Sequence, residues 1–523
     1  MDMNMKKKSN IIFLGTGSDV GKSVTATAFC RILKHRGYRV APFKAQNMSN
    51  NSFVTLEGGE IGRAQVTQAE ACGLAPSVHM NPVLLKPNSD MGSQVVLQGQ
   101  VYGNMAARDY YGLKSEIKSK VRESYQKLEQ EYDTIVMEGA GSCCEVNLRE
   151  HDIVNFEMAL SVGAPVVLVA DIDKGGVFAQ IIGALEIISP EERNLVAGFI
   201  INKFRGDPGL FKTGIEYIEQ RTGKPVFGLV PVFTDFKIDA EDSMSLEKTI
   251  ASHSHARASE RESPKSDQCI HIAVVRLPHV SNFTDLEVLE NEPEVMITWL
   301  KTPDQLEKYD VIILPGSKST VSDMTWLHER GWVTPVKKFA DRDNKLVVGL
   351  CGGFQMLGIE IGDPHEIEGR TKKTQGLGLL NVFTEIEKTK VVRRSVGQDK
   401  LFGVKVCGYE IHMGRTKLSS SSRTEGREAD KNFLELETGP DGAINSRGNV
   451  FGTYLHGLFD SGAFRKKFLE HVAKEKGILF DNAIERRDYW AEKDKNYDQL
   501  AEHFSKYVDV EHIIRIMEKR IDN

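Results

Sequence analysis

Residues 10–23 read NIIFLGTGSDVGKS, an apolar run followed by a glycine-containing turn and by Gly21-Lys22-Ser23. The run predicts a buried strand and the residues after it a helix, so the turn joins a strand end to a helix N-terminus. Backbone N–H groups in such a turn point at phosphate oxygens, Lys22 reaches the β- and γ-phosphates, and the Ser23 hydroxyl ligates Mg²⁺. The stretch predicts an α/β domain that binds ATP and Mg²⁺.

The spacing of this loop differs from the GxxxxGK[ST] pattern. That pattern needs a glycine at position 16, where the chain has Thr16, and Gly15 lies one residue further away. Dethiobiotin synthetase and its relatives resemble this chain in having the longer loop, with an acidic residue two positions before the glycine, here Asp19. We therefore assign the loop residues Thr16, Gly17, Asp19 and Gly21 to phosphate binding. The alternative is an ordinary glycine turn between a strand and a helix.

Further apolar runs alternate with helix-length segments, which is typical of a parallel sheet covered by helices on both faces. The predicted strands are Asn10–Leu14, Thr134–Met137, Pro165–Ala170, Val196–Ile201 and Val226–Val230. Ligands of such a sheet bind at the carboxyl ends of its strands.

Three polar residues follow strands of this sheet. Lys44 is predicted to meet the transferred phosphate, unless it is a surface lysine. Glu138 ends a strand, where its carboxylate is placed to hold Mg²⁺ directly or through water. Asn202 resembles the base-recognition asparagine of related nucleotidases, with a simple strand-end cap as the alternative.

A polar stretch at 239–268 then interrupts the apolar runs and predicts a linker. Later runs, His271–Arg276, Val311–Leu314, Leu346–Leu350 and the region around Val450–Leu455, indicate a second α/β domain. We therefore divide the chain into an ATP-binding domain (9–238), the linker (239–268), a second domain (269–463) and a helical extension (464–523) that packs on the second domain.

The segment KLVVGLCGGFQMLG (345–358) places Cys351 between a predicted buried strand and a glycine-opened helix. Such an elbow exposes a nucleophile, and nearby N–H groups form an oxyanion hole, here at Gly352 and at the glycine turn of Gly316. The helix N-terminus lowers the pKa of a thiol. His456 is the predicted base. The alternatives are a buried structural cysteine and a core histidine with its hydrogen bonds satisfied.

Composition bounds the class of protein. The chain has 523 residues and a formal net charge of −6, which argues against charge-driven nucleic-acid binding. No run approaches the length of a membrane span, and seven scattered cysteines fit reduced thiols. We expect a cytoplasmic protein that acts on small molecules, and leave open whether it forms a homo-oligomer.

The Cys351 and His456 segments resemble the class I glutamine amidotransferases, in which a Cys–His–Glu triad releases ammonia from glutamine. In that family the carboxylate follows the histidine by two positions, where this chain has Leu458. Either another carboxylate orients His456 or the site is a dyad. We select Glu410, in GYEIHMG, as the substitute, and expect His412 to line the same cleft.

Several longer stretches resemble the cobyric acid synthase family, among them FKAQNMSNNS (43–52), LPHVSNFTDLEVL (277–289), PGSKSTVSDMTWL (315–327) and GTYLHGLFD (452–460). The resemblance implies amidation of four peripheral carboxylates of a corrinoid, (adenosyl)cobyrinic acid a,c-diamide, with one ATP and one glutamine each. It also implies a place near the corrinoid or the phosphates for Glu60, Arg63, Gln65 and Gln68. The duller alternative for this segment is an amphipathic helix with its polar residues facing solvent.

Two other readings stay open. Cobyrinic acid a,c-diamide synthase has the same two domains but amidates two carboxylates. A P-loop ATPase of the partitioning type with an inert glutaminase-like domain would bind nucleotide without amidation; intact Cys351 and His456 argue against it.

Overall fold

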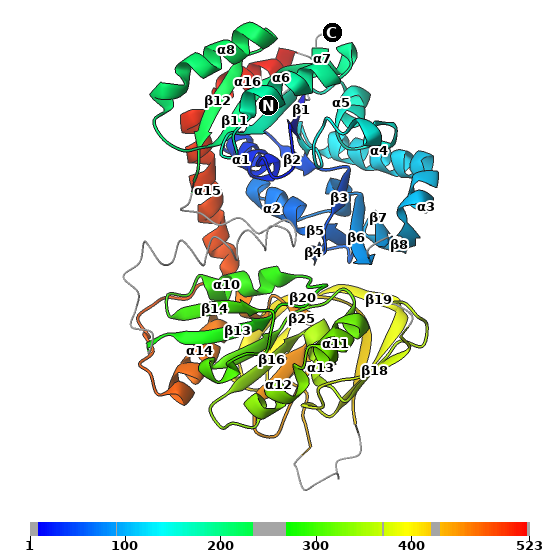
Figure 1. The fold of residues 1–523 in the computed structure, drawn as a ribbon, viewed down its shortest axis with the longest axis vertical. Coiled ribbons are helices and arrows are strands. Elements are labelled where there is room, and N and C mark those ends of the chain that lie inside the picture. Colours follow the sequence, from blue (N-terminus) through cyan, green and yellow to red (C-terminus); the bar gives the residue numbers. More distant parts are fainter. Residues whose placement is uncertain (1–8, 90–91, 234–267, 369–370, 420–428, 520–523) are drawn as a thin grey trace, which may run out of the picture.

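The computed structural model describes residues 9–89, 92–233, 268–368, 371–419 and 429–519, which form two α/β domains stacked one above the other (Figure 1). The expected fold class, two α/β domains with parallel sheets, is confirmed. Most of the expected linker, 239–267, lies outside the described residues.

The first domain is built on a six-stranded parallel sheet of order β12-β11-β10-β1-β9-β2. The strands are β1 (Ser9–Gly15), β2 (Val40–Phe43), β9 (Thr134–Glu138), β10 (Val166–Asp171), β11 (Val196–Phe204) and β12 (Val226–Pro231). Along β1, Ile12 and Leu14 enter one apolar core, whereas Ile11 and Phe13 enter another. Because side chains alternate along a strand, both faces of the sheet are buried, as the apolar runs predicted.

Helices cover both faces of this sheet (Figure 1). Those of the first domain are α1 (Lys22–His35), α2 (Arg63–Cys72), α3 (Ala107–Gly112), α4 (Lys114–Glu131), α5 (Phe156–Val162), α6 (Val177–Ile187), α7 (Pro190–Leu195) and α8 (Lys212–Thr222). Short 3-10 turns occupy Val78–Met80, Val146–His151 and Pro208–Phe211.

A small second sheet lies beside the first, and sequence patterns did not predict it. Its order is β3-β6-β7-β8, from Gln46–Met48, Val83–Ser89, Gly92–Leu97 and Gln100–Ala106. A separate hairpin, β4 (Ser52–Val54) and β5 (Glu60–Gly62), leads into α2. Helix α2 is buried along nearly its whole length, so the alternative of a solvent-facing helix is wrong.

The second domain contains a sheet of order β14-β13-β15-β16-β24-β23, parallel except for the edge strand β23. Two long antiparallel strands, β19 (Val382–Asp399) and β20 (Lys405–Leu418), form a second sheet with β17, β18 and β25 and, at one end, β21 and β22. The other strands are β13 (Ile270–Val275), β14 (Val295–Leu300), β15 (Val311–Leu314), β16 (Leu346–Leu350), β17 (Glu360–Gly362), β18 (Lys373–Gln375), β21 (Leu434–Leu436), β22 (Gly439–Asp441), β23 (Ala443–Ile444), β24 (Val450–Thr453) and β25 (Leu455–His456). Its helices are α10 (Glu287–Glu290), α11 (Thr320–Glu329), α12 (Val333–Ala340), α13 (Gly352–Leu357) and α14 (Gly462–Lys476), with 3-10 turns at Phe283–Leu286, Leu306–Lys308 and Leu458–Asp460.

The expectation that residues 464–523 pack on the second domain is wrong for the last two helices. Helix α14 contributes Phe464 and Phe468 to a core of the second domain. Helix α15 (Tyr489–Tyr507) instead runs from the second domain to the first, and α16 (Val510–Lys519) ends there (Figure 1). Their apolar side chains share a core with β1 and α1, so these two helices help to cover that face of the first sheet.

Helix α15 therefore joins the two domains. Tyr489 at its start belongs to the second domain's core, and Phe504 near its end belongs to the first domain's. Buried Arg31 of α1 makes ion pairs with Asp494 and Asp498 on the same helix, at 2.9 and 2.6 Å.

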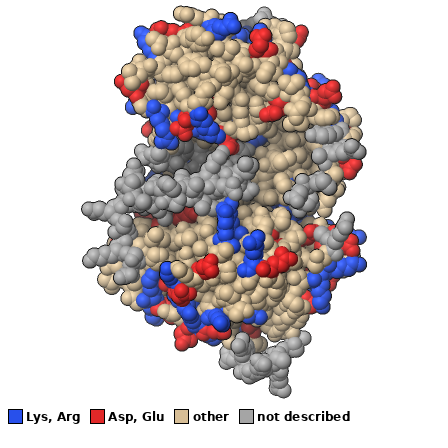
Figure 2. All heavy atoms as spheres, viewed as in Figure 1, with Lys and Arg blue, Asp and Glu red and all other residues tan. Residues whose placement is uncertain are grey.

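The surface carries side chains of both charges. Positive and negative side chains are interspersed on the face drawn in Figure 2. Within the described part of the chain, no helix is long and apolar enough to cross a bilayer.

We predict that Phe504→Ala lowers the free energy of unfolding by about 3–5 kcal/mol, because it removes a fully buried aromatic side chain from the core that α15 shares with β1. Chemical denaturation followed by circular dichroism measures the loss. Leu479→Ala, at a side chain that is 95% exposed, is the control and should change little. Equal stability of the two variants would contradict the packing of α15 on the first domain.

Candidate active sites

The glycine turn at 15–23 connects β1 to α1 as predicted. Gly21 precedes the helix with φ +98°, and Asp19 also has a positive φ of 58°. A Cβ atom on Gly21 would lie 2.1 Å from Nδ2 of Asn202, so only glycine fits here. The turn therefore wraps closely against the end of β11.

Glu138 is the centre of the polar cluster at the end of the sheet. Its Oε1 accepts from the Ser23 hydroxyl at 2.7 Å and lies 3.0 Å from the Lys44 ammonium. Its Oε2 accepts from the Gln68 amide at 2.6 Å. The Lys22 ammonium donates to the carbonyl of Gly141, three residues after Glu138, at 2.8 Å. Five predicted residues from four segments thus meet beside the helix N-terminus.

The other loop residues are held by bonds to neighbouring helices and to strand β11. The Thr16 hydroxyl donates to Gln180 at 3.3 Å, and the Gly17 carbonyl accepts from Lys22 at 3.3 Å. The Asn202 amide donates to the Val20 carbonyl at 3.0 Å, and its oxygen accepts from the N–H of Lys203. Because both ends of this amide bind within the chain, the geometry favours the strand-end role for Asn202 over base recognition.

The Lys203 side chain ties the loop to β10 as well. Its ammonium donates to the carbonyl of Asp19 and pairs with Asp171 at 2.8 Å. Lys203 itself has a positive φ of 61°. The loop is thus braced before any ligand binds.

A cavity of about 580 Å³ opens beside this cluster. One wall is the segment after β9, which includes Gly141 and touches the phosphate loop through an N–H of Cys143 that donates to the Gly15 carbonyl. The opposite wall is the small sheet, through Leu85, Ser93 and Val95. The cavity offers space for a second ligand next to a bound nucleotide.

In the second domain, Cys351 occupies the elbow that its sequence predicted. It lies between β16 and α13 with φ 51° and ψ −106°, a strained conformation for a residue with a side chain. A Cβ atom on Gly352 would lie 2.7 Å from the N atom of Ser317, and one on Gly316 would lie 3.5 Å from His456 Cε1. The two predicted oxyanion turns therefore meet beside Cys351 and His456.

Asp285, not Glu410, orients His456. The Asp285 carboxylate lies 2.7 Å from His456 Nδ1 and also accepts from the N–H of Gly457 at 2.9 Å. Burial disfavours charge on His456, but the charges of Asp285 and Cys351 outweigh it and raise its pKa to about 10. The triad carboxylate thus comes from the opposite end of the domain sequence.

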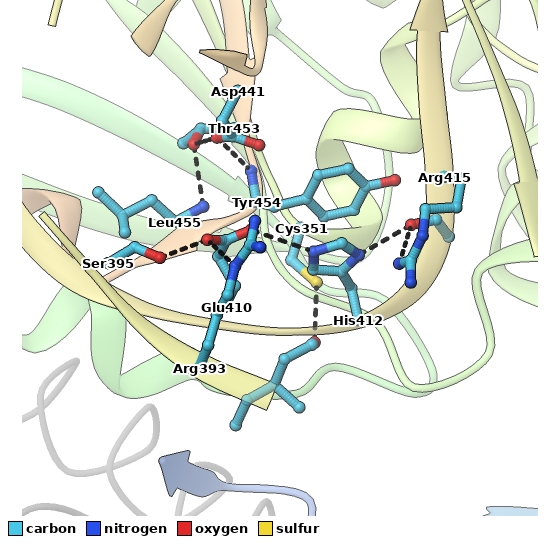
Figure 3. Close-up of polar contacts among 12 residues, drawn as sticks. Cys351, Arg393, Ser395, Glu410, His412, Arg415, Asp441, Thr453, Tyr454 and Leu455 are labelled. Carbon is cyan, nitrogen blue, oxygen red and sulfur yellow. Dashed lines mark hydrogen bonds and ion pairs between the residues drawn. The ribbon is translucent and has the colours of Figure 1, made fainter. Parts of the chain in front are cut away.

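The selection of Glu410 for this role is wrong because other groups bind its carboxylate. Arg393 pairs with both oxygens at 2.8 and 2.9 Å, and Ser395 donates to one of them (Figure 3). Burial raises the pKa of Glu410, but hydrogen bonds from His412, Arg393 and Ser395 lower it to about 2. Residues 410 and 456 do lie close, on the paired strands β20 and β25. In that register Tyr409 is opposite His456 and Glu410 is opposite Leu455, and neighbouring side chains on one strand point to opposite faces.

His412 lies beside Glu410 as expected, with its ring stacked on Tyr454 at 3.7 Å. Ile411 precedes His412 in the chain, and its carbonyl lies 3.6 Å from the Cys351 thiol (Figure 3). Strand β20 therefore lines the Cys351 site.

The predicted corrinoid residues take three different positions. Gln68 joins the Glu138 cluster. Gln65 is fully buried and accepts from the Asn47 amide at 3.2 Å. Glu60 and Arg63 lie at the contact between the domains: Glu60 binds Lys390 at 2.6 Å, and the Arg63 guanidinium stacks on Phe53 and Trp490. Of these four residues, only Gln68 lies in the Glu138 cluster.

Comparisons with known proteins identify both domains. The model of the "CobQ/CobB/MinD/ParA nucleotide binding domain" matches residues 11–246, and that of the "CobB/CobQ-like glutamine amidotransferase domain" matches 271–464. Cobyric acid synthase of Syntrophobacter fumaroxidans is 45% identical over 97% of this chain and 98% of its own length. The enzyme of Chlorobium chlorochromatii is 44% identical over 98% of each chain.

The chain belongs to the cobyric acid synthase family. Like that family, it is an ATP-dependent ligase with glutamine as amido donor. A solved structure titled glutamine amidotransferase aligns with a TM-score of 0.30 at 16% identity over 40% of this chain and 99% of its own, too low a score to compare the folds.

We predict that Asp285→Asn lowers the rate of glutamine hydrolysis by about 10²–10⁴-fold, since His456 loses the carboxylate that fixes its tautomer and favours its charged form. Glutamate release from glutamine, compared under identical conditions, measures the rate. Glu410→Gln is the matched control, because it changes a buried carboxylate of the same domain that does not contact His456 through any described bond. A larger loss in Glu410→Gln would return the orienting role to Glu410.

Proposed function

We propose that this protein amidates the b, d, e and g carboxylates of (adenosyl)cobyrinic acid a,c-diamide, with one ATP and one glutamine for each amide. The observation that carries the proposal is the similarity to named cobyric acid synthases over nearly the whole of both chains. The two sites described above supply the two half-reactions that such an amidation needs.

In the glutaminase half-reaction, the Cys351 thiolate attacks the amide carbon of glutamine. The oxyanion forms beside the turns at Gly316 and Gly352, where backbone N–H groups stabilise it. His456, held by Asp285, gives its proton to the departing ammonia and then activates the water that hydrolyses the thioester to glutamate. The strained elbow supports this role, since strain of this kind is stored at functional residues.

In the synthetase half-reaction, a corrinoid carboxylate attacks the γ-phosphorus of ATP, and ADP leaves. The resulting acyl phosphate reacts with ammonia to give the amide and phosphate. Lys22 and Lys44 carry the positive charge that balances the transferred phosphoryl group. A carboxylate is a poor acyl donor, so phosphorylation supplies the leaving group.

The donor set at Glu138 fits Mg²⁺. One carboxylate with the adjacent Ser23 hydroxyl is typical of sites where the ion keeps waters and binds substrate phosphates. Among described residues no group of three or more His, Cys, Asp or Glu side chains could hold a metal by itself. Bound there, Mg²⁺ would neutralise charge on the phosphates.

The cavity beside the phosphate loop is the proposed acceptor site. It lies next to Gly141, whose carbonyl binds Lys22, so a carboxylate at this end of the cavity is adjacent to the phosphates. Its walls combine apolar side chains with Arg149 and His151, a mixture suited to a large ring with peripheral carboxylates. Gln68 borders the same cluster through Glu138.

We predict that incubation with cobyrinic acid a,c-diamide, Mg-ATP and glutamine produces four successive replacements of OH by NH₂, matched by four ADP and four glutamate. Mass spectrometry of the corrinoid and counts of both products measure this. An unchanged corrinoid with consumption of ATP and glutamine would mean that the substrate is wrong. No glutamine hydrolysis under any condition would favour the ATPase with an inert second domain.

We also predict that Cys351→Ala abolishes glutamine-dependent amidation but retains amidation with added ammonium chloride, because only the nitrogen source is lost. Lys44→Met should have the opposite pattern, with glutamine hydrolysis retained and amidation lost from both nitrogen sources. The two variants control for each other. Loss of both activities in Cys351→Ala would contradict separate sites.

A further inference from the structure

A backbone group of the first domain reaches the histidine of the second. The N–H of Ser52, in β4, donates to Oδ1 of Asn282 at 3.0 Å. The other end of the same amide, Nδ2, lies 3.2 Å from Nε2 of His456. All three residues are buried, at 1%, 4% and 1% exposure, so water does not compete for these bonds. Asn282 thus connects strand β4 of the first domain to His456 of the second domain.

This link fixes which way the amide faces. An N–H only donates, so the group that meets Ser52 N–H must be the amide oxygen. The amide nitrogen is then directed at His456 Nε2, which must accept, and the imidazole proton lies on Nδ1, toward Asp285. The Asn282 amide therefore opposes the protonation of His456 Nε2, which the charges of Asp285 and Cys351 favour.

Catalysis needs the opposite arrangement. When His456 takes the proton of the Cys351 thiol, Nε2 becomes a donor and can no longer accept from Asn282. The Asn282 amide must then turn or withdraw, and either movement breaks the bond to Ser52 N–H. The asparagine stabilises the uncharged thiol and imidazole for as long as β4 stays in place.

A second contact joins the same strand to the same histidine. The Phe53 ring packs edge-on against Tyr409 at 4.6 Å, and Tyr409 stacks on the His456 ring at 5.3 Å. A shift of β4 therefore changes both the hydrogen bonding and the ring packing of His456.

A buried charge cluster holds β4. Glu60 Oε1 accepts from the Ser52 hydroxyl at 2.8 Å and from Lys86 at 2.6 Å. Its other oxygen binds Lys390 of β19, in the second domain, at 2.6 Å, and Lys390 also donates to Gln94 at 3.1 Å. Because buried charges are costly to leave unpaired, these contacts should move together.

This cluster lies on the reverse side of the cavity wall. In the small sheet, Lys86 pairs in register with Gln94, and both point to the charge cluster. Their neighbours Leu85, Pro87, Ser93 and Val95 line the cavity, as the alternation of side chains along strands requires. A ligand that presses on the cavity wall therefore acts on the sheet that carries Lys86 and Gln94.

We propose that Asn282 is a positioning residue that holds the glutaminase site inactive until ligands in the first domain displace β4. Binding of the acceptor and nucleotide moves the small sheet, the Glu60 cluster relaxes, and Ser52 releases Asn282. His456 then accepts the thiol proton, so glutamine is hydrolysed only while the acceptor and the nucleotide are bound in the first domain. This inference rests on the proposed function, since it assumes that Cys351 and His456 hydrolyse glutamine.

The test compares the full-length wild type with Asn282→Ala and Lys390→Met. Glutamate release is measured without ligands and with Mg-ATP plus cobyrinic acid a,c-diamide. Without ligands, we expect both variants to hydrolyse glutamine about tenfold faster than wild type and to use more than one glutamine for each amide. Lys400→Met, which removes an exposed lysine paired with Glu435 just after β19, is the matched control and should behave as wild type.

The pH dependence of Cys351 alkylation by iodoacetamide reports on ionisation of the thiol. If Asn282 only stabilised the fold, its substitution would not change this pH dependence. The groups that face His456 are Asp285, Cys351, Tyr409 and Asn282, and only Asn282 is changed. In the ligand-free Asn282→Ala variant, the pH at which alkylation reaches half its maximum rate should fall below the wild-type value, because thiolate formation no longer has to break the amide contact.

The outcomes separate the two proposals. If the wild type hydrolyses glutamine equally fast with and without ligands, or if Asn282→Ala is slower or unchanged while amidation with ammonium chloride persists, the inference is overturned and the proposed function stands. If the wild type never hydrolyses glutamine, both the inference about Asn282 and the proposed function are overturned.

Discussion

Buried carboxylates must be compensated, and this constraint organises both active sites and the contact between them. Glu138, Asp285 and Glu60 are each 5% exposed or less. Water cannot stabilise their charge, so each is bound by an ammonium group, an imidazole or several N–H and O–H donors. At Glu138 the partners include residues assigned to phosphate binding, at Asp285 the partner is the proposed base His456, and at Glu60 the partners are lysines from two domains. Each carboxylate draws together segments distant in sequence.

The residues that the sequence predicted are those whose roles depend on local structure. A strand, a glycine turn and a helix are adjacent along the chain, so the phosphate loop and the Cys351 elbow could be placed from their own segments. Asp285 could not, because it lies 171 residues from His456 and follows no fixed spacing. The only signal was its place in LPHVSNFTDLEVL, a stretch that resembles the family but carries no motif of its own. Glu410, the carboxylate of GYEIHMG, was selected instead, and its strand does pair with that of His456 although its side chain does not contact the imidazole.

Sequence patterns also could not predict which domain the helices at the end of the chain pack against. Periodicity predicts that a helix has an apolar face, but it does not say which surface covers that face. The apolar residues of α15 and α16 fit the first sheet as well as any other uncovered surface, and chain order alone favoured the second domain. The structure places them on the first because β1 and α1 present an apolar face there. The helix that follows the second domain thus helps to fix how the two domains meet.

Resemblance to a family identifies important residues without saying what they do. The resemblance implies a place near the corrinoid or the phosphates for four residues, Glu60, Arg63, Gln65 and Gln68. Glu60 and Arg63 instead lie at the contact between the domains, and only Gln68 joins the Glu138 cluster. An enzyme that must pass ammonia from one site to another loses it to protonation and dilution if the sites act independently. The surfaces that hold the domains in register are therefore constrained as strongly as the groups that touch substrate. In this chain the two constraints meet in one short hairpin, β4–β5, whose backbone reaches Asn282 and whose Glu60 side chain binds Lys390.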